Sequence, residues 1–152
     1  MSSASSKDVL ERAKAEEDLF EAAKALSQYL SVLLSVEYDI DSVDRIAKAR
    51  RLEDFAEGVY NALRRRENLI QKIKEALTKA PDENTKNALM NALRSVEGFS
   101  VFKVDTLINQ LRSGDGARLK LIASYIGSRA IAFTSTEYKV REFFDQIRGG
   151  GG

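Results

Sequence analysis

The chain has 152 residues, 43% of them apolar and 31% charged, which is enough for one folded domain with a sizeable core. It contains no Cys, His or Trp, so disulfides, thiolate chemistry and histidine-based catalysis or metal ligation are excluded. No apolar run approaches 18 residues and the N-terminus lacks the apolar core of a signal peptide, so we expect a soluble, cytoplasmic protein without membrane contact.

The net charge of +1 hides an uneven distribution along the chain. Residues 1–44 hold four basic and ten acidic residues (−6), residues 45–79 hold ten and five (+5), and residues 80–152 hold ten and eight (+2). Such a split indicates an acidic side and a basic side, which suits binding to a polyanion or head-to-tail stacking of copies. Two faces that are simply solvated would show the same pattern.

The first predicted helix runs from Asp8 to about Val36, because apolar residues recur there at intervals of three and four. A capping box with Ser5 is expected at its start. Its acidic run, residues 16–18 with Glu21, could hold a hard cation, but acids in the first half of a helix are more often favoured by the helix dipole alone. The inward positions are expected to be Val9, Ala13, Leu19, Phe20, Ala23, Leu26, Leu30, Leu33 and Leu34.

Residues 37–41 are predicted to be a short connection, with Asp41 or Ser42 capping the next helix. A short helix over about 42–50 and a longer helical pattern over 52–79 follow. The longer pattern drifts near residues 66–68, so both one helix and two are compatible with it, and Gly58 inside it indicates close helix packing. Its apolar stripe consists of Leu52, Phe55, Ala56, Val59, Leu63, Ile70, Ile73 and Leu77.

The only proline, Pro81, marks the clearest boundary in the chain. Beyond it we predict helices from Asn84 or Thr85 to about 97, over 100–112 with Val101 inward, over 117–131 after a turn capped by Asp115, and over 135–147. A second capping box is expected at Thr134 and Glu137. The prediction is an all-α protein: a single compact bundle of six to eight helices over residues 1–148, with little or no β structure and a flexible Gly tail over 149–152.

No group of residues has the pattern of a catalytic site. The Ser residues have no His to activate them, and no Lys lies in a setting that predicts a lowered pKa. The Gly-containing turn at 113–116 lacks the spacing of a phosphate-binding P-loop. We therefore predict no enzyme, no cofactor and no bound metal. Tyr29, Tyr60 and Tyr125 could stack on bases, although a Tyr on a helix more often has its ring in the core and its hydroxyl at the rim.

Basic residues between 45 and 66 form two groups that predict contacts with a nucleic-acid backbone. If the segment is helical, the groups lie about 15 residues or roughly 20 Å apart, which suits several phosphates along one strand. Pairs with nearby acids, such as Glu53, Asp54, Glu57 or Glu67, would use up part of this charge. The candidate nucleic-acid-binding residues are Arg45, Lys48, Arg50 and Arg51, then Arg64, Arg65 and Arg66, and also Arg118 and Lys120 near a predicted helix N-terminus.

The motif Val43-Asp44-Arg45-Ile46-Ala47, after an apolar first helix, resembles the small subunit of archaeal type I-A CRISPR effector complexes. The chain departs from the family pattern at Lys48-Ala49, and the resemblance does not extend to residues 80–152. It implies a non-enzymatic subunit of an antiviral, RNA-guided complex, present in several copies beside other subunits. Such a subunit would contact target DNA, the displaced strand and possibly crRNA through the backbone, while base pairing reads the sequence.

Two alternatives remain open from the residues alone. One is a stand-alone helical DNA-coating protein, viral or chromosomal, which would bind bare duplex tightly. The other is a helical protein–protein adaptor that binds no nucleic acid, in which substitution of the arginines would change only the affinity for the partner protein.

Overall fold

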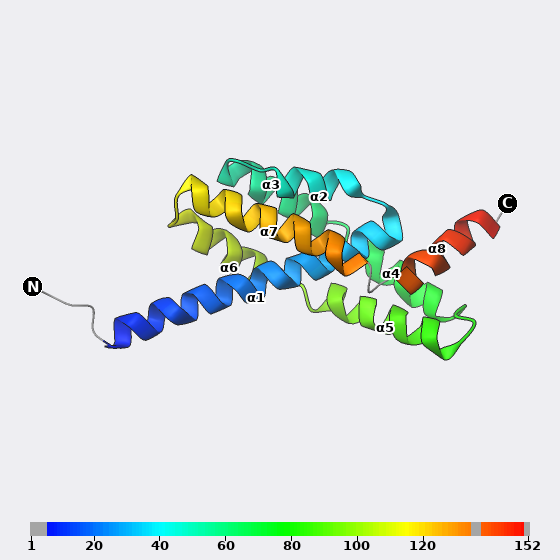
Figure 1. Cartoon of the computed structure of the whole chain (residues 1–152). Helices are drawn as coiled ribbons and strands as arrows, with labels where there is room; N and C mark the ends of the chain where they lie inside the picture. Colours follow the sequence, from blue (N-terminus) through cyan, green and yellow to red (C-terminus); the bar gives the residue numbers. More distant parts are fainter. Residues whose placement is uncertain (1–5, 135–137, 151–152) are drawn as a thin grey trace, which may run out of the picture.

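The computed structural model describes residues 6–134 and 138–150, and within these ranges it contains eight α-helices and no β-strand (Figure 1). The prediction of an all-α bundle with six to eight helices is confirmed. No described helix has the length and apolar character that crossing a membrane requires. The helices are α1 (Ser6–Glu37), α2 (Ile40–Ala47), α3 (Leu52–Leu63), α4 (Arg66–Leu77), α5 (Glu83–Glu97), α6 (Val101–Arg112), α7 (Gly116–Thr134) and α8 (Tyr138–Gly150).

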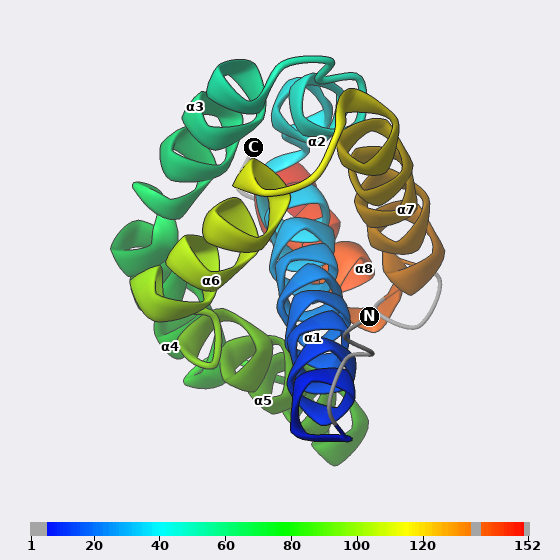
Figure 2. The same cartoon turned by 90° about the vertical axis from the view of Figure 1, so that its left-hand side faces the viewer.

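Helix α1 is the axis around which the other helices pack. Its 32 residues span about 48 Å, and it contacts α5, α6, α7 and α8 along its second half. Figure 2 looks nearly along α1 and shows the other helices arranged around it. The first part of α1 extends beyond them, so Val9 (55% exposed) and Phe20 (48%) are not core residues, and Ala13 is exposed too. The predicted inward positions were wrong there: in the described structure Val9 and Ala13 are left at the surface, and Phe20 is covered in part by the ring of Tyr125 of α7.

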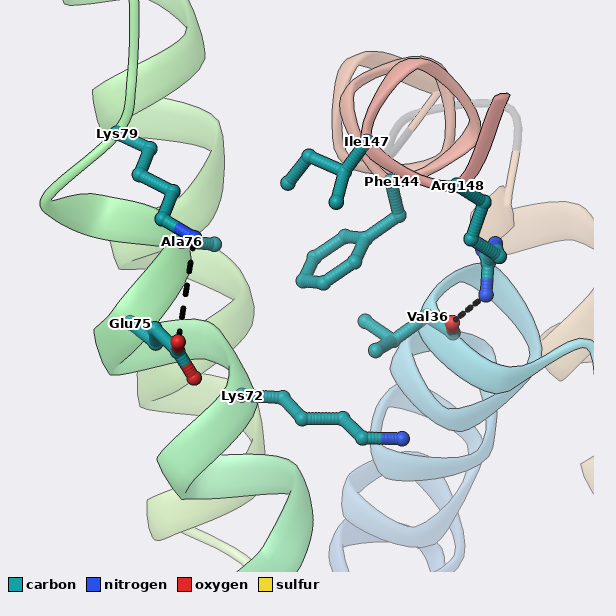
Figure 3. A pocket seen from close by; sticks show the side chains of 8 residues that line it. All are labelled: Val36, Lys72, Glu75, Ala76, Lys79, Phe144, Ile147 and Arg148. Carbon is teal, nitrogen blue, oxygen red and sulfur yellow. Dashed lines mark hydrogen bonds and ion pairs between the residues drawn. The ribbon is translucent and has the colours of Figure 1, made fainter. Parts of the chain in front are cut away.

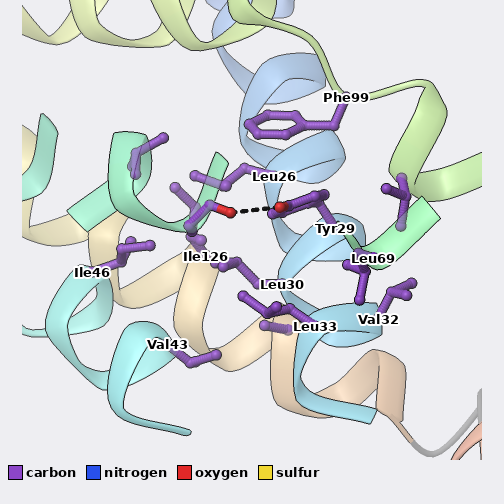
Figure 4. Packing of buried hydrophobic residues seen from close by; sticks show 14 of the residues in the cluster. Leu26, Tyr29, Leu30, Val32, Leu33, Val43, Ile46, Leu69, Phe99 and Ile126 are labelled. Carbon is purple, nitrogen blue, oxygen red and sulfur yellow. Dashed lines mark hydrogen bonds between the residues drawn. The ribbon is translucent and has the colours of Figure 1, made fainter. Parts of the chain in front are cut away.

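The hydroxyl of Tyr29 is a buried polar group that links helices far apart in the sequence. Tyr29 lies fully buried on α1, donates a hydrogen bond of 2.5 Å to the backbone carbonyl of Ala62 on α3, and packs its ring 5.0 Å from that of Phe99 (Figure 4). A buried tyrosine hydroxyl normally finds such a partner. This contact ties the centre of α1 to the end of α3 and to the connection between α5 and α6.

The connection after α1 is shorter than predicted, and Asp39 caps α2 in place of Asp41 or Ser42. Asp39 accepts hydrogen bonds from the backbone N–H and the hydroxyl of Ser42, at 3.1 and 2.6 Å. The preceding residue, Tyr38, has a φ of 58°, a left-handed conformation that turns the chain sharply. That turn lets α2 begin at Ile40, ahead of the predicted caps.

The longer helical pattern over 52–79 is two helices, because α3 ends at Leu63 and α4 begins at Arg66. The predicted stripe is confirmed: Phe55, Val59, Ile70 and Ile73 are buried and its other members pack against the core. The predicted close approach at Gly58 is confirmed as well, since an added Cβ would lie 3.0 Å from Cγ1 of Ile46.

The second half follows the predicted order with small shifts. Helix α5 begins at Glu83, one position before the predicted start, and Asp82 caps it. Asp115 caps α7 as predicted by accepting from the N–H of Arg118 at 2.9 Å. Val101 is 56% exposed because Ser100 caps α6 and leaves its first turn at the surface. Gly149 and Gly150, predicted to lie in the tail, continue α8, whose backbone hydrogen bonds need no side chain. Ser5 and Glu137, with the predicted capping boxes, lie outside the described residues.

Candidate nucleic-acid interface

The first group of predicted basic residues surrounds a hollow of 440 Å³ where α2 passes into α3. Arg45 comes from α2, Lys48 from the C-cap of that helix and Arg50 from the connection, and Ala49, Asp54 and Glu57 complete the lining. Arg45 and Arg50 are exposed and form no ion pair or hydrogen bond within the described part of the chain. The hollow therefore presents two unpaired guanidinium groups to the solvent.

The other two cations of this group are engaged only loosely. Lys48 lies 3.4 Å from Asp44 one turn earlier, with 77% of its side chain exposed. Arg51 lies 3.7 Å from Glu53 and 3.6 Å from Asp54, and 73% of its side chain is exposed. Ion pairs this exposed contribute little to stability, so a phosphate can replace the carboxylate at small cost.

Arg65, from the second predicted group, is bound to acids of the connection after α1. Its guanidinium pairs with Asp39 and lies 3.4 Å from a carboxylate oxygen of Glu37, whose other oxygen pairs with Lys72 at 3.2 Å. The two carboxylates are only 10% and 13% exposed. This network neutralises Arg65 and joins the start of α4 to the α1–α2 connection.

Arg66 binds backbone carbonyls at the end of α5. Its guanidinium donates to the backbone carbonyls of Phe99 at 2.8 Å, Glu97 at 2.9 Å and Val96 at 3.2 Å, and it pairs with Glu67 at 3.0 Å. The last carbonyls of a helix lack partners within the helix, so this arginine satisfies them. Only 26% of the Arg66 side chain is exposed. Its donors are thus used inside the protein.

Arg64 is the one cation of the second group that stays exposed without an ion pair in the described structure; it donates to the side chain of Asn61 at 3.1 Å. The ends of α3 lie about 17 Å apart for eleven residue steps, with Arg51 before its first residue and Arg64 after its last. The two predicted groups are only partly separated, because Arg45 of α2 lies beside Gly58 and lines another hollow together with Arg65. The two groups differ in the number of exposed cations that could bind a ligand, because Arg65 and Arg66 of the second group form contacts within the fold.

Arg118 and Lys120 lie in the first turns of α7, after the α6–α7 connection. This connection and the α2–α3 connection lie at the same end of the bundle (Figures 1 and 2). Lys120 is exposed and unpaired among the described residues, whereas Arg118 pairs with Glu16 of α1. Arg112, at the last residue of α6 and also exposed, belongs to this end and was missed in the sequence, because only the helix order reveals its place.

The three tyrosines considered for base stacking have other partners. Tyr29 is fully buried, which rules out a stacking role for its ring. Tyr60 donates a hydrogen bond of 2.8 Å to Asp105, and this bond raises the pKa of Tyr60. Tyr125 packs edge-on against Phe20 at 6.0 Å between ring centroids, with the guanidinium of Arg129 over its ring.

The described residues include exposed cationic groups that can bind an anionic ligand. No group of three or more acidic side chains among them is placed to hold a metal ion, so the run at 16–18 carries no such site there. Comparison of the chain with models of known families, with curated proteins and with solved structures found no match. The geometry supports contact between guanidinium groups and anionic oxygens, which Arg makes in a bidentate manner.

Proposed function

We propose that this protein is a non-enzymatic structural subunit that contacts the phosphate backbone of nucleic acid. The observation that carries the proposal is the hollow between α2 and α3, where Arg45 and Arg50 have no partner among the described residues and lie beside the loosely held Lys48. Cations that stabilise a fold are bound to partners within it, as Arg65 is to Asp39 and Arg66 to the carbonyl of Phe99. Unpaired arginines around one hollow suit a ligand with several anionic oxygens.

The most specific form of the proposal is the small subunit of a type I-A CRISPR effector complex. The motif that resembles this family, residues 43–47, lies on α2, and its Arg45 is one of the two unpaired cations at the hollow. In such a complex the subunit, present in several copies in the cytoplasm, would steady target DNA and the displaced strand while guide pairing reads the sequence.

A protein–protein adaptor is the second candidate, and one observation favours it. Asp54 and Glu57 line the same hollow as the arginines. Positive and negative side chains are therefore mixed on this surface, which suits charge complementarity with another protein. A stand-alone DNA-coating protein would need a larger excess of unpaired cations, because its affinity for bare duplex comes from phosphate contacts alone.

A salt titration of DNA binding tests the proposal. The purified protein is titrated against single- and double-stranded DNA between about 50 and 200 mM salt, and the logarithm of the binding constant is plotted against that of the salt concentration. The variant Arg45→Ala/Lys48→Ala/Arg50→Ala should bind more weakly at every salt concentration. The slope of its plot should become shallower by roughly 0.7 to 0.9 for each phosphate that the variant no longer neutralises.

The matched control is Lys24→Ala/Lys74→Ala/Lys86→Ala, which removes the same charge from exposed positions on α1, α4 and α5. An equal decrease of the slope in both triple variants would mean that only net charge matters and would remove the site from the hollow. If the wild type binds neither DNA at about 50 mM salt, phosphate contact by the isolated chain is ruled out and the adaptor is favoured.

A further inference from the structure

The first part of α1, residues 6–18, meets the rest of the bundle at its base, where Glu16 pairs with Arg118 of α7, and we call it the arm. Every residue of the arm except Ala15 is exposed, and it extends beyond the bundle in Figure 1. Its apolar residues Val9 and Leu10 are 55% and 69% exposed. An isolated helix of 13 residues is marginal in water, and adjacent apolar side chains add the cost of exposed apolar surface. The arm is therefore built to pack against something else.

The arm also carries acids that the fold leaves unused. Glu11 and Glu17 are exposed and form no ion pair among the described residues, whereas Glu16 pairs with Arg118 at the base of the arm. Five acids against three basic residues give the arm a net charge of −2. A partner surface for it should accordingly combine an apolar floor with a basic rim.

A surface with this chemistry lies at the other end of the molecule, in a hollow of 310 Å³ between α4 and α8 (Figure 3). Its floor is Val36 with Phe144 and Ile147, which α8 directs towards α4. Ile147 is 39% exposed, although it is a large apolar residue. Val36 and Phe144 are buried, so Ile147 is the exposed apolar residue of the floor, and covering it would be favourable.

The rim of this hollow is basic. Lys72, Lys79 and Arg148 surround the floor with side chains that are 46%, 60% and 42% exposed, and Glu75 is the one acid in the lining. Lys79 is held only weakly, 3.9 Å from Glu75. The ammonium group of Lys79 is therefore free to turn towards an incoming carboxylate at small cost.

We infer that the arm of one copy of this chain docks in the α4–α8 hollow of the next copy, with Val9 and Leu10 on the apolar floor and Glu11 and Glu17 towards the basic rim. The two surfaces lie at opposite ends of the molecule (Figure 1), so an arm cannot occupy its own hollow. A contact between two different surfaces is heterologous, and it builds an open row of copies unless the rotation closes a ring.

The inference rests on the part of the proposed function that places several copies side by side, and it names the surfaces that join them. Its test contains no nucleic acid, so its failure is distinguishable from a failure of the phosphate site. The mass of the wild type is measured by sedimentation and light scattering as its concentration is raised. The average mass should rise steadily above the chain mass of 16.9 kDa.

Two variants each remove one surface. Val9→Asp/Leu10→Asp alters the arm, and Lys79→Glu/Ile147→Asp alters the hollow; all four positions are exposed. Each variant alone should be monomeric. A mixture of the two should form a species of twice the chain mass and nothing larger, because one intact arm then meets one intact hollow. The control, Val101→Asp, places one acid at an exposed apolar residue of α6, away from both surfaces, and should associate as the wild type does.

Three results would overturn the inference. A wild type that stays monomeric up to about 1 mM has no such contact. A hollow variant that associates like the wild type would show that arms pair with arms. A mixture that stays monomeric would show that the arm does not bind in the hollow. Circular dichroism and thermal unfolding of each variant confirm that the bundle is intact, so a monomeric result reports the contact itself.

Discussion

Arg66 of α4 donates a hydrogen bond of 2.8 Å to the backbone carbonyl of Phe99, thirty-three residues later, and so closes the end of α5. We expect Arg66→Ala to lower the free energy of unfolding by about 2–3 kcal/mol, because it removes a charged donor from the carbonyls of Phe99 and Glu97, whereas Val96 keeps a backbone bond from Phe99 at 3.3 Å. Urea denaturation measures this change.

Arg64→Ala is the matched control for Arg66→Ala. Arg64 is exposed and touches only Asn61, so its removal should change the stability by no more than about 0.5 kcal/mol. Equal decreases in stability for the two variants would mean that the three hydrogen bonds from Arg66 to backbone carbonyls do not stabilise the folded state.

A second prediction concerns the buried hydroxyl of Tyr29. Tyr29→Phe should cost about 1 kcal/mol, the usual net value of one hydrogen bond, since Ala62 keeps a backbone bond from Arg65 at 3.2 Å. The decrease should appear as a shift of the urea midpoint with an unchanged slope. A variant as stable as the wild type would show that the 2.5 Å contact is not formed in solution.

The same residue makes stability depend on pH. Burial, and next the negative charge of Glu37, raise the pKa of Tyr29 well above its ordinary value of 10.0. Above pH 10 the unfolded chain releases this proton while the folded protein keeps it, so the unfolded state binds fewer protons and stability falls as pH rises. The contribution is complete below pH 10 and is lost as pH rises towards the folded pKa.

Tyr29→Phe lacks this group, so the deficit of the variant relative to the wild type should shrink above pH 10, by up to about 1.4 kcal/mol per pH unit. Unfolding measured at pH 8, 10 and 11 on both proteins checks this, and Lys and the other tyrosines cancel in the difference. A constant deficit across that range would contradict the raised pKa.

A third prediction concerns the contact between α2 and α7. A Cβ added at Gly127 would lie 2.4 Å from the Cβ of Ala47, whereas one added at Gly116, at the start of α7, would meet nothing within 4 Å. Gly127→Ala should therefore destabilise by about 1–3 kcal/mol. Gly116→Ala should leave the stability unchanged or raise it by up to about 1 kcal/mol. Thermal unfolding of the pair measures the difference, and equal melting temperatures would contradict the close packing.

Helical periodicity predicted most of the fold, because it reports directly which residues face a core. The all-α class, the turn at Pro81 and the stripe from Leu52 to Leu77 follow from spacing alone. The positions of Val9 and Phe20 did not, because the same spacing occurs where a helix is exposed, as at Val9, or only partly covered, as at Phe20. Periodicity shows that a face is apolar, and it says nothing of what covers that face.

The candidate site was harder to predict, for an electrostatic reason. Charge counted along the chain treats Arg64, Arg65 and Arg66 alike, but the partners of Arg65 and Arg66 come from residues about thirty positions away. Only the folded arrangement shows that Arg65 meets Asp39, that Arg66 meets the end of α5, and that Arg64 meets neither. The same arrangement leaves Arg45 unpaired.

The central place of α1 has a consequence for the chain while it is being made. Leu26 and Leu30 leave the ribosome early, but α7, their main cover, follows about a hundred residues later. At 5–20 residues per second, their apolar face stays uncovered for roughly 5–20 s. During that interval the chain depends on the helices from α2 to α6, or on a chaperone, to shield its longest helix.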